Sequence, residues 1–406
     1  MGAKADCGEP PRLSDPPDLS DDLSDLHDPR FIADPYPAYA RLRAGAALPR
    51  VDGERWVLDH ADVLTVLQDR RFGKAPTAND LLGADTGAPS LLSLNAPAHT
   101  RLRALVNRAF VPAAVERLRP RVAQIGSALL DQALRRGAAF DVVSDYAGPL
   151  PAIVIAELLG VPETDHQAFR AWSRAIAAGL DSGRAAEAYE QAWQARAALT
   201  AYFRGLVAAR RRERGPDLLS ALIAVEEDGD RLSPDELLSL CQLLLIAGHE
   251  TTTHLIAVGT VTLLRHPEQW RRLAADPTLW PSAVEEILRF EPPVHFTGRM
   301  ALEATSLHGV DIAAGEWVQV AIGAANRDPA VFADPDRFDV ARAPNPHLSF
   351  GRGIHFCLGA PLARLEGQIA LRMLTARCPG LMVAAPGPHW SGNYLIRGLE
   401  RLPVRA

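Results

Sequence analysis

The sequence predicts a mainly α-helical protein with a small β-rich region. Apolar residues recur at helical spacing along most of the chain, and strand-like alternation of apolar and polar residues is confined to two short stretches. The chain has 406 residues, 48% of them hydrophobic, enough for a large core. No linker, charge block or repeat divides it, so we expect one domain over residues 1–406, with residues 1–30, acidic and proline-rich, only loosely ordered.

The composition excludes several classes of partner and location. The formal net charge is -6, so no overall basic field would attract nucleic acid or an anionic membrane. The cysteines, Cys7, Cys241, Cys357 and Cys378, are too few and too scattered for a disulfide framework, and we expect a cytoplasmic protein. Residues 1–30 lack the basic and apolar segments of a signal peptide, and no membrane anchor is expected.

The two alternating stretches place the expected strands. The first, 55–58, comes just before a helical pattern over 61–68, and the second, 307–320, surrounds the turn-forming pair Ala314-Gly315. Between them, segment 73–97 is rich in proline and glycine and predicts a long irregular loop. Because long irregular segments inside compact domains are often functional, we interpret 73–97 as a binding loop.

The clearest helix begins at 233–236, where Ser-Pro-Asp-Glu offers a capping serine, a proline at the first helical position and a glutamate at the third. It should end near His266-Pro267. At a rise of ~1.5 Å per residue it spans ~50 Å. Its apolar content resembles that of a membrane span, but the polar block 249–254 at its centre would be costly in lipid, so we predict a buried core helix.

The polar block allows two interpretations, but not a zinc protease. That motif needs histidines four residues apart, whereas His249 and His254 are five apart and point roughly 140° away from each other. Ala247 and Gly248 leave little side-chain bulk, and a helical glycine costs about 1 kcal/mol relative to alanine, which indicates that a flat or bulky group approaches the backbone. Alternatively, the threonine hydroxyls simply bond back to carbonyls of the same helix.

A glycine-rich segment at 350–360 surrounds Cys357. Its glycines permit a tight turn, and the apolar run from Leu362 indicates that a helix starts just after the cysteine. Free backbone N–H groups and the positive end of the helix dipole would stabilise a thiolate at Cys357. Cys241 and Cys378 are interpreted instead as small buried hydrophobes.

At these residues the sequence resembles the cytochrome P450 family. Segment 350–359 matches the haem-thiolate signature F-G-x-G-x-H-x-C-x-G at every specified position. Segment 247–251, Ala-Gly-His-Glu-Thr, matches the family's oxygen-activation motif, and 286–289, Glu-Ile-Leu-Arg, matches its E-x-x-R pair. Segments 34–37, 99–103 and 334–338 also look like family landmarks, so the resemblance covers nearly the whole chain and suggests the soluble bacterial class.

The resemblance implies a haem b (iron protoporphyrin IX) between the long central helix and the helix after the cysteine loop, with Cys357 as the iron ligand. It further implies that His99, Arg103, Arg299 and His355 bind the haem propionates and that Glu286 and Arg289 form a buried structural ion pair. Phe350 and Gly351 belong to the cysteine loop, and Ala247 and Gly248 to the helix beside the haem. In one departure, many relatives have Asp-Pro-Pro before the histidine at 99, whereas this chain has Asn-Ala-Pro at 95–97.

The implied function is that of a monooxygenase that inserts one atom of O2 into a hydrophobic small molecule, by hydroxylation or epoxidation, with Thr251 and Glu250 supplying protons. An enzyme of the same fold that uses peroxide or couples rings is the alternative. The Glu250-Thr251 pair favours O2 but does not exclude coupling. Retention of Cys357 disfavours a non-catalytic binding module.

Reducing power is expected from a separate protein, because no flavin, iron–sulfur or G-x-G-x-x-G segment follows the cysteine motif. The resemblance suggests an acidic ferredoxin, reduced by an NAD(P)H-dependent ferredoxin reductase and docking near Cys357. Arg352 and Arg364, with Arg101 or Arg108, are the candidate contacts, and we expect a monomer.

The resemblance also places the substrate pocket among segments 74–95, 168–185, 243–247 and 294–297 and a turn near Tyr394. These segments are largely apolar. His295 and Thr297 are either contacts for a polar group of the substrate or ordinary strand residues.

Overall fold

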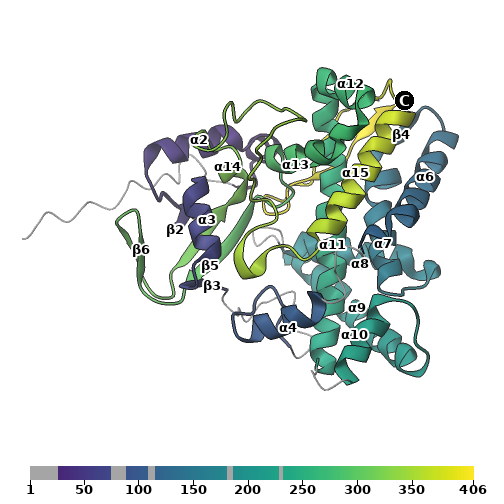
Figure 1. The fold of residues 1–406 in the computed structure, drawn as a ribbon, viewed down its shortest axis with the longest axis horizontal. Helices are drawn as coiled ribbons and strands as arrows, with labels where there is room; N and C mark the ends of the chain where they lie inside the picture. The colour runs from purple at the N-terminus through teal and green to yellow at the C-terminus, as the bar shows by residue number, and fades with distance from the viewer. Residues whose placement is uncertain (1–25, 75–87, 108–114, 181–185, 228–231) are drawn as a thin grey trace, which may run out of the picture.

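The computed structural model describes residues 26–74, 88–107, 115–180, 186–227 and 232–406 (Figure 1). In Figure 1 the long helices gather on the right and the larger sheet lies on the left, which confirms the predicted mainly α fold with a small β-rich region. Residues 1–25 lie outside the described part of the chain, and residues 29–33 form the short helix α1. The single domain remains a prediction.

Helices account for most of the described residues. The α-helices are α1 (Pro29–Ala33), α2 (Tyr36–Gly45), α3 (His60–Gln68), α4 (Ala98–Asn107), α6 (Arg119–Arg135), α7 (Pro149–Leu158), α8 (His166–Gly179), α9 (Ala186–Arg212), α10 (Leu218–Glu227), α11 (Pro234–Arg265), α12 (Pro267–Ala275), α13 (Trp280–Phe290), α14 (Ile322–Ala325) and α15 (Ala360–Arg377). Short 3-10 turns are η4 (Glu163–Asp165), η5 (Pro277–Leu279) and η6 (Gly353–His355), and η3 (Val143–Ala147) is a π-helical turn.

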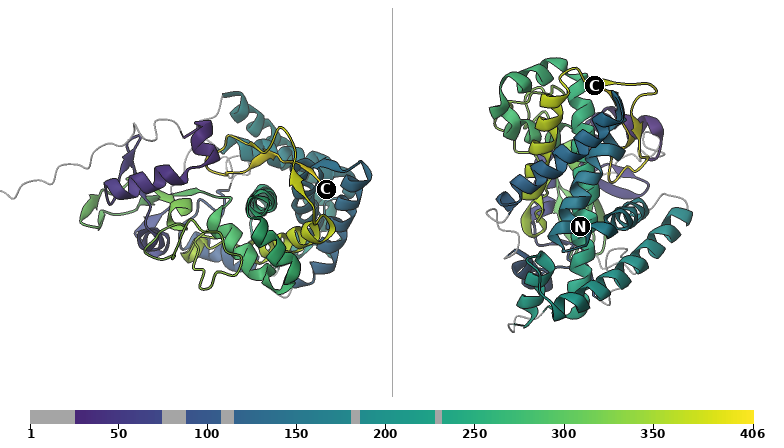
Figure 2. Two further views of the ribbon diagram at one scale, coloured as in Figure 1. Left: turned by 90° about the horizontal axis from the view of Figure 1, so that it is seen from above. Right: turned by 90° about the vertical axis from the view of Figure 1, so that its right-hand side faces the viewer.

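The central helix α11 begins and ends as predicted. Ser233 Oγ accepts a hydrogen bond from the Glu236 N–H at 3.1 Å, and the Glu236 carboxylate accepts one from the Ser233 N–H at 2.9 Å, so the capping box is complete. The helix ends at Arg265, before His266 and Pro267. It packs against α7, α8 and α15. In the left view of Figure 2 it is seen end-on near the centre of the helical part. Within the described residues, no helix is long and apolar enough to cross a membrane.

A five-stranded sheet forms the β-rich part, with the order β1-β2-β8-β5-β3. Its strands are β1 (Arg50–Val51), β2 (Glu54–Val57), β3 (Phe72–Gly73), β5 (Phe296–Ala301) and β8 (Trp317–Ala321). Strands β2 and β8 are parallel and the other pairs are antiparallel.

The expectation that strands occur in only two stretches is wrong, because β5 forms part of the sheet interior and was missed. Its Gly298 lies under the Trp317 ring, where a Cβ would come within 1.7 Å, and Arg299 is buried beside it. Because Gly298 and Arg299 occupy buried positions that are usually apolar, the alternation of apolar and polar residues typical of a strand is not visible in the sequence.

Three smaller sheets complete the fold, with the orders β4-β12-β9, β10-β11 and β6-β7. They consist of β4 (Ala139–Asp141), β6 (Thr305–Leu307), β7 (Val310–Ile312), β9 (Met382–Val383), β10 (His389–Trp390), β11 (Leu399–Arg401) and β12 (Pro403–Arg405). Strands of two or three residues are too short to show a period, so only β6 and β7, inside the predicted stretch 307–320 or next to it, could be foreseen.

The predicted irregular loop is confirmed where it is described. Residues 88–97 form turns without helix or strand and lead directly into α4. Residues 75–87 of the same segment lie outside the described residues. Cys241 and Cys378 are buried and unpaired, as predicted.

Candidate active site

The middle of α11 has one open face in an otherwise buried helix. Ala247 is exposed, and Gly248 and Thr251 are half-buried, although the helix is buried at most positions on either side of them. Residues three or four apart share one side of a helix. The open face, defined as Ala247, Gly248 and Thr251, therefore borders a space that the described side chains leave unfilled.

Packing against the neighbouring helix does not explain Gly248. A Cβ built at this position would lie 3.5 Å from the Ile155 side chain of α7, which is an ordinary van der Waals contact. An alanine would fit there without strain on that side. The absence of a side chain at Gly248 is thus better explained by a bulky ligand at the open face than by the packing of α7.

The threonine hydroxyls do bond back to the helix. Thr251 Oγ1 donates to the Ala247 carbonyl at 2.7 Å, and Thr253 Oγ1 donates to the His249 carbonyl at 3.0 Å. The two threonines differ in exposure, since Thr253 is buried and Thr251 belongs to the open face. Back-bonding fixes the Thr251 rotamer and leaves the lone pairs of its oxygen available to a ligand.

Glu250 lies between two buried histidines. His249 Nδ1 is 3.4 Å from Glu250 Oε1, and His254 Nε2 is 3.7 Å from Glu250 Oε2. Burial lowers the pKa of His249 to about 3 and that of His254 to about 4, so both rings are neutral at pH 7. Neither ring therefore offers Glu250 a full positive charge.

The pKa of Glu250 is raised to about 7, because burial disfavours its charged form more than Arg174 and Arg170 of α8 favour it. An acid with a pKa near the working pH gives up and regains a proton at little cost. The Oε1 atom of Glu250 and the Nδ1 atoms of His249 and His254 are buried without a hydrogen-bond partner among the described residues. Buried polar atoms of this kind are usually bonded to water, so this cluster is a candidate path for protons.

The cysteine loop has the geometry that its glycines predicted. Gly351 and Gly353 have φ values of 66° and 70°, in the left-handed region that favours glycine. A Cβ on Gly353 would also come within 2.4 Å of the Leu67 carbonyl at the end of α3. The Cys357 N–H closes the loop on the Phe350 carbonyl at 2.9 Å, and α15 starts at Ala360, just after the cysteine as predicted.

Two opposing effects act on the Cys357 thiol. Burial raises its pKa, while backbone hydrogen bonds from Gly359 and Ala360 and the charges of Arg103 and Arg364 lower it. The N–H donors expected at the helix start are present, but burial outweighs them in the protein without a metal. A metal cation bound to the sulfur would reverse this balance, because a coordinated thiol loses its proton.

The structure brings the four predicted propionate ligands to one place beside the cysteine loop. The rings of His99 and His355 lie 4.3 Å apart, and the charges of Arg299 and Arg103 lower the pKa of His355, which burial brings to about 3. Arg299 NH1 donates to Thr297 Oγ1 at 3.2 Å and to the Gly298 carbonyl at 2.9 Å. Burial lowers the pKa of Arg299 to about 10.

These residues fit a ligand with two carboxylates. Both ring nitrogens of His99 and the Nε2 atom of His355 are buried without a partner within the described residues, and Arg299 has no carboxylate in contact there. Unpaired buried cations and ring nitrogens are unfavourable, so an anionic group is needed to satisfy them. The two propionates of haem b supply such groups, next to a cysteine that supplies an iron ligand.

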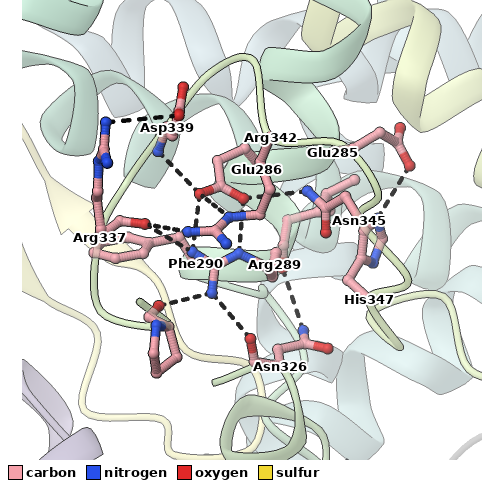
Figure 3. A network of polar contacts seen from close by, with 12 residues as sticks. Glu285, Glu286, Arg289, Phe290, Asn326, Arg337, Asp339, Arg342, Asn345 and His347 are labelled. Atoms are coloured by element: carbon pink, nitrogen blue, oxygen red, sulfur yellow. Dashed lines mark hydrogen bonds and ion pairs between the residues drawn. The ribbon is translucent and has the colours of Figure 1, made fainter. Parts of the chain in front are cut away.

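Glu286 and Arg289 form the predicted buried ion pair on α13 (Figure 3). Arg289 donates to both carboxylate oxygens, at 2.7 and 2.8 Å, and both side chains are fully buried. Glu286 also accepts from Arg342 and Asn345, at 3.1 Å each. Because the Glu286–Arg289 pair itself is fully buried, its role is positioning.

The network reaches the cysteine loop through Asn326. Arg289 NH1 donates to the Asn326 carbonyl at 3.0 Å, and the Asn326 side chain accepts from the Leu348 N–H and donates to Ser349 Oγ, at 2.8 Å each. These two residues directly precede Phe350. The ion pair on α13 is thereby connected to the backbone that presents Cys357.

One of the two candidates for a polar substrate contact lies away from any open surface. His295 is fully buried, accepts or shares a hydrogen bond with the Tyr39 hydroxyl at 3.0 Å, and packs against Gly323, where a Cβ would come within 2.7 Å of its ring. Thr297, on β5, bonds to Arg299 instead. Both are thus explained as parts of the sheet region.

The arginines expected to meet a redox partner differ in how free they are. Arg364 donates to both carboxylate oxygens of Glu285, at 2.7 and 2.8 Å, and Arg101 pairs with Glu236. Arg108 lies outside the described residues. Arg352 makes no salt bridge to a described residue and precedes Ile354, which is 51% exposed on the cysteine loop.

Sequence reasoning missed Lys74 and Asn95, which the structure places beside Arg299 and His99. Lys74 Nζ donates to Thr297 Oγ1 at 3.1 Å, and Asn95 holds the Lys74 backbone. One signal was available: two of the forty-three basic residues are lysines, Lys4 and Lys74, and the others are arginines. Because nearly all other basic residues are arginines, the lysine at position 74 calls for a specific structural explanation.

A scan against protein-family models matches residues 167–378 to cytochrome P450. The cytochrome P450 monooxygenase PikC of Streptomyces venezuelae is 46% identical over 389 residues, covering 92% of each chain. The 6-deoxyerythronolide B hydroxylase of Saccharopolyspora erythraea is 43% identical over 405 residues, covering 94% of this chain and 98% of that one.

A solved structure of P450BioI, in complex with an acyl carrier protein that carries hexadec-9Z-enoic acid, superimposes with a TM-score of 0.88 at 38% identity. The match covers 93% of this chain and all of that one. The chain belongs to the cytochrome P450 family, and it is a haem-dependent monooxygenase with the family's fold.

Proposed function

We propose that this P450 inserts one oxygen atom from O2 into a hydrophobic small molecule, by hydroxylation or epoxidation. The observation that carries this proposal is the position of Glu250, whose pKa is about 7, directly beside Thr251 on the open face of α11. The reaction with O2 requires protons that the protein must deliver, whereas hydrogen peroxide already carries its protons. A poised acid next to an accessible hydroxyl is what the first reaction needs.

The chain's own residues provide the binding of the cofactor. Cys357 would ligate the iron, the open face at Ala247 and Gly248 would leave room for the ring, and Phe350 and Gly351 shape the loop that carries the cysteine. His99, Arg103, Arg299 and His355 bind the propionates. When bound, the haem supplies the activation of O2 and the transfer of an oxygen atom to carbon.

Proton supply is the task of Glu250 and Thr251. Glu250, whose pKa is about 7, passes a proton toward the open face, and the buried, unpartnered polar atoms of His249 and His254 beside it are candidates for bonds to water that would reload it. Thr251 Oγ1 donates its own hydrogen to the Ala247 carbonyl, so its lone pairs remain free to accept a hydrogen bond from a proton donor at the open face.

The substrate is proposed to be apolar over most of its surface. Leu243 and Leu244, one turn before Ala247 on the same side of α11, border the open face with hydrocarbon. The names of the relatives agree, since one is a hydroxylase of 6-deoxyerythronolide B and another structure holds a hexadecenoic acid.

Electrons are proposed to come from an acidic ferredoxin, reduced by an NAD(P)H-dependent ferredoxin reductase, in the cytoplasm, with the P450 acting as a monomer. Support comes from Arg352, which forms no salt bridge with a described residue, and from the exposed Ile354 on the loop that carries Cys357. A positive charge beside an exposed apolar side chain suits a small acidic partner.

The proposal is tested in two steps. Hydrophobic metabolites are first screened for the shift of the Soret band that accompanies substrate binding. A compound that binds is then turned over with ferredoxin, reductase and isotopically labelled dioxygen, and the product is analysed by mass spectrometry. We expect one labelled oxygen atom in the product. An unlabelled coupled product, or turnover that needs added peroxide, would contradict the proposal.

A further inference from the structure

Lys74 has no anionic partner among the described residues. Its Nζ donates to Thr297 Oγ1 at 3.1 Å and to the Gly298 carbonyl at 3.0 Å, and Arg299 donates to the same two oxygens. Two positive side chains thus share two neutral acceptors. No carboxylate of the described residues forms a salt bridge with either one. Burial and the charge of Arg299 lower the pKa of Lys74 to about 7.

The position of Lys74 identifies where the missing anion would bind. Its charge, like those of Arg299 and Arg103, lowers the pKa of His355, so all of these groups surround one place. Arg103 already donates to the Phe356 carbonyl at 2.7 Å and to Asn107 at 2.9 Å. The hydrogen bonds of Arg103, like those of Arg299 and Lys74, go to neutral acceptors, so the charges of all three remain for the two propionates.

Asn95 fixes the backbone of Lys74 in both directions. The Lys74 N–H donates to Asn95 Oδ1 at 2.8 Å, and Asn95 Nδ2 donates to the Lys74 carbonyl at 2.7 Å. The Asn95 carbonyl also accepts from the His99 N–H at 2.9 Å. Gly73 permits this approach, since a Cβ there would come within 2.7 Å of Asn95 Oδ1.

An aspartate at position 95 would accept hydrogen bonds but donate none when ionised. Only the amide satisfies both backbone groups of Lys74. The asparagine at 95 and the lysine at 74 are thereby explained together.

We propose that Lys74, positioned by Asn95, forms an ion pair with a haem propionate and acts with Arg299 as an anchor of the cofactor. The inference rests on the proposed binding of the propionates beside His355. It adds a binding residue, Lys74, and a positioning residue, Asn95, to that site. A compact ammonium group suits this role, because it reaches a carboxylate while its other donors keep Thr297 and Gly298.

The first test follows the ionisation of Lys74 in the intact holoenzyme. Because Lys4 and Lys74 are the only lysines, protein labelled with carbon-13 at the lysine Cε gives two lysine signals, and Lys4→Met assigns them. The reduced, carbon-monoxide-bound state is diamagnetic and suits this titration. An ion pair with a propionate should bring the pKa of Lys74 about 2 units or more above 7. Titration of Lys74 near 7 in the holoenzyme would overturn the proposal.

The second test measures haem loss by transfer to apomyoglobin. A hydrogen bond to a charged group contributes about 1.5 to 3 kcal/mol, so Lys74→Met should release haem about tenfold faster or more, with Lys4→Met as the matched control. Asn95→Asp should release it about fivefold faster and should have no further effect when combined with Lys74→Met. Equal rates for Lys74→Met and Lys4→Met, or full additivity of the double variant, would contradict the proposal.

The two proposals fail in different ways. A red-shifted Soret band in the reduced, carbon-monoxide-bound protein with an unaffected rate of haem loss in Lys74→Met would refute the anchor alone. A protein that binds no haem through a thiolate would refute the proposed site itself.

Discussion

His254 Nε2 lies 3.7 Å from Glu250 Oε2, one turn further along α11, and both side chains are largely buried. The histidine is neutral at pH 7, since burial lowers its pKa to about 4. It therefore lies beside the carboxyl group without adding a positive charge that would keep it ionised. Burial thus raises the pKa of Glu250 to about 7 against the charges of Arg174 and Arg170, with no opposing charge from His254.

The yield of product per electron should depend on the protonation of Glu250. Because the acid must be protonated to act, and its pKa is about 7, the yield should be high below pH 7 and fall as the pH rises through 7. Glu250→Gln should lower the rate of product formation by ~10² to 10⁴-fold and abolish this pH dependence. Product and consumed NAD(P)H are measured from pH 6 to 8.5. The exposed Glu268→Gln serves as control, and an unchanged profile in Glu250→Gln would exclude Glu250.

Gly398 is predicted to be required because of His254. A Cβ at 398 would come within 1.9 Å of the His254 ring, so Gly398→Ala must displace the histidine, at a cost of about 1 to 3 kcal/mol in the free energy of unfolding. The double variant Gly398→Ala with His254→Ala should regain most of the stability lost. Chemical denaturation measures both. If the losses of the two single variants simply add, the crowding is not with His254.

Cys357 is predicted to be the thiolate ligand of the iron. The reduced protein should bind carbon monoxide with a strongly red-shifted Soret band, and Cys357→Ser should lose it. Cys241→Ser and Cys378→Ser, both at buried positions remote from the loop in sequence, should keep the band. A red-shifted band that survives Cys357→Ser would refute the assignment.

Two i, i+3 ion pairs among the described residues should differ greatly in their contribution to stability. Glu286→Gln leaves Arg289 buried and partly unpaired, so the free energy of unfolding should fall by about 3 to 5 kcal/mol and the thiolate spectrum should be disturbed. Glu116→Gln breaks the exposed pair with Arg119, which has the same spacing, and should leave the free energy of unfolding nearly unchanged. Similar losses in both variants would mean that the buried network does not support the cysteine loop.

Reversal of Arg352 should weaken reduction by ferredoxin. Opposite charges act mainly on the association rate, so Arg352→Glu should slow reduction at low salt, and the difference should shrink as the salt concentration rises. Arg405→Glu, exposed on β12, is the control. Arg364 is unsuitable for this test, because its reversal would break its pair with Glu285. Reduction that is indifferent to both salt and Arg352→Glu would place the docking site elsewhere.

The parts of the fold that could be predicted from sequence are those with a local signal. The capping box at Ser233 marked the start of α11, and the glycines around Cys357 marked its loop, because each acts within a few residues. Strand β5 had no such signal, since Gly298 is explained only by Trp317, nineteen positions away along the chain. Lys74 was missed for the same reason: its partners Asn95 and Thr297 are close only in space.

The contact between Gly353 and the Leu67 carbonyl has a consequence for engineering. The cysteine loop lies directly against the end of α3, so the segment that presents the iron ligand is shaped by the β-rich part as well as by α15. A chimera that takes residues 26–74 from one relative and the cysteine loop from another must therefore match this close approach of the two backbones. If the two backbones do not match there, we expect the helices of the chimera to fold but the haem to be lost.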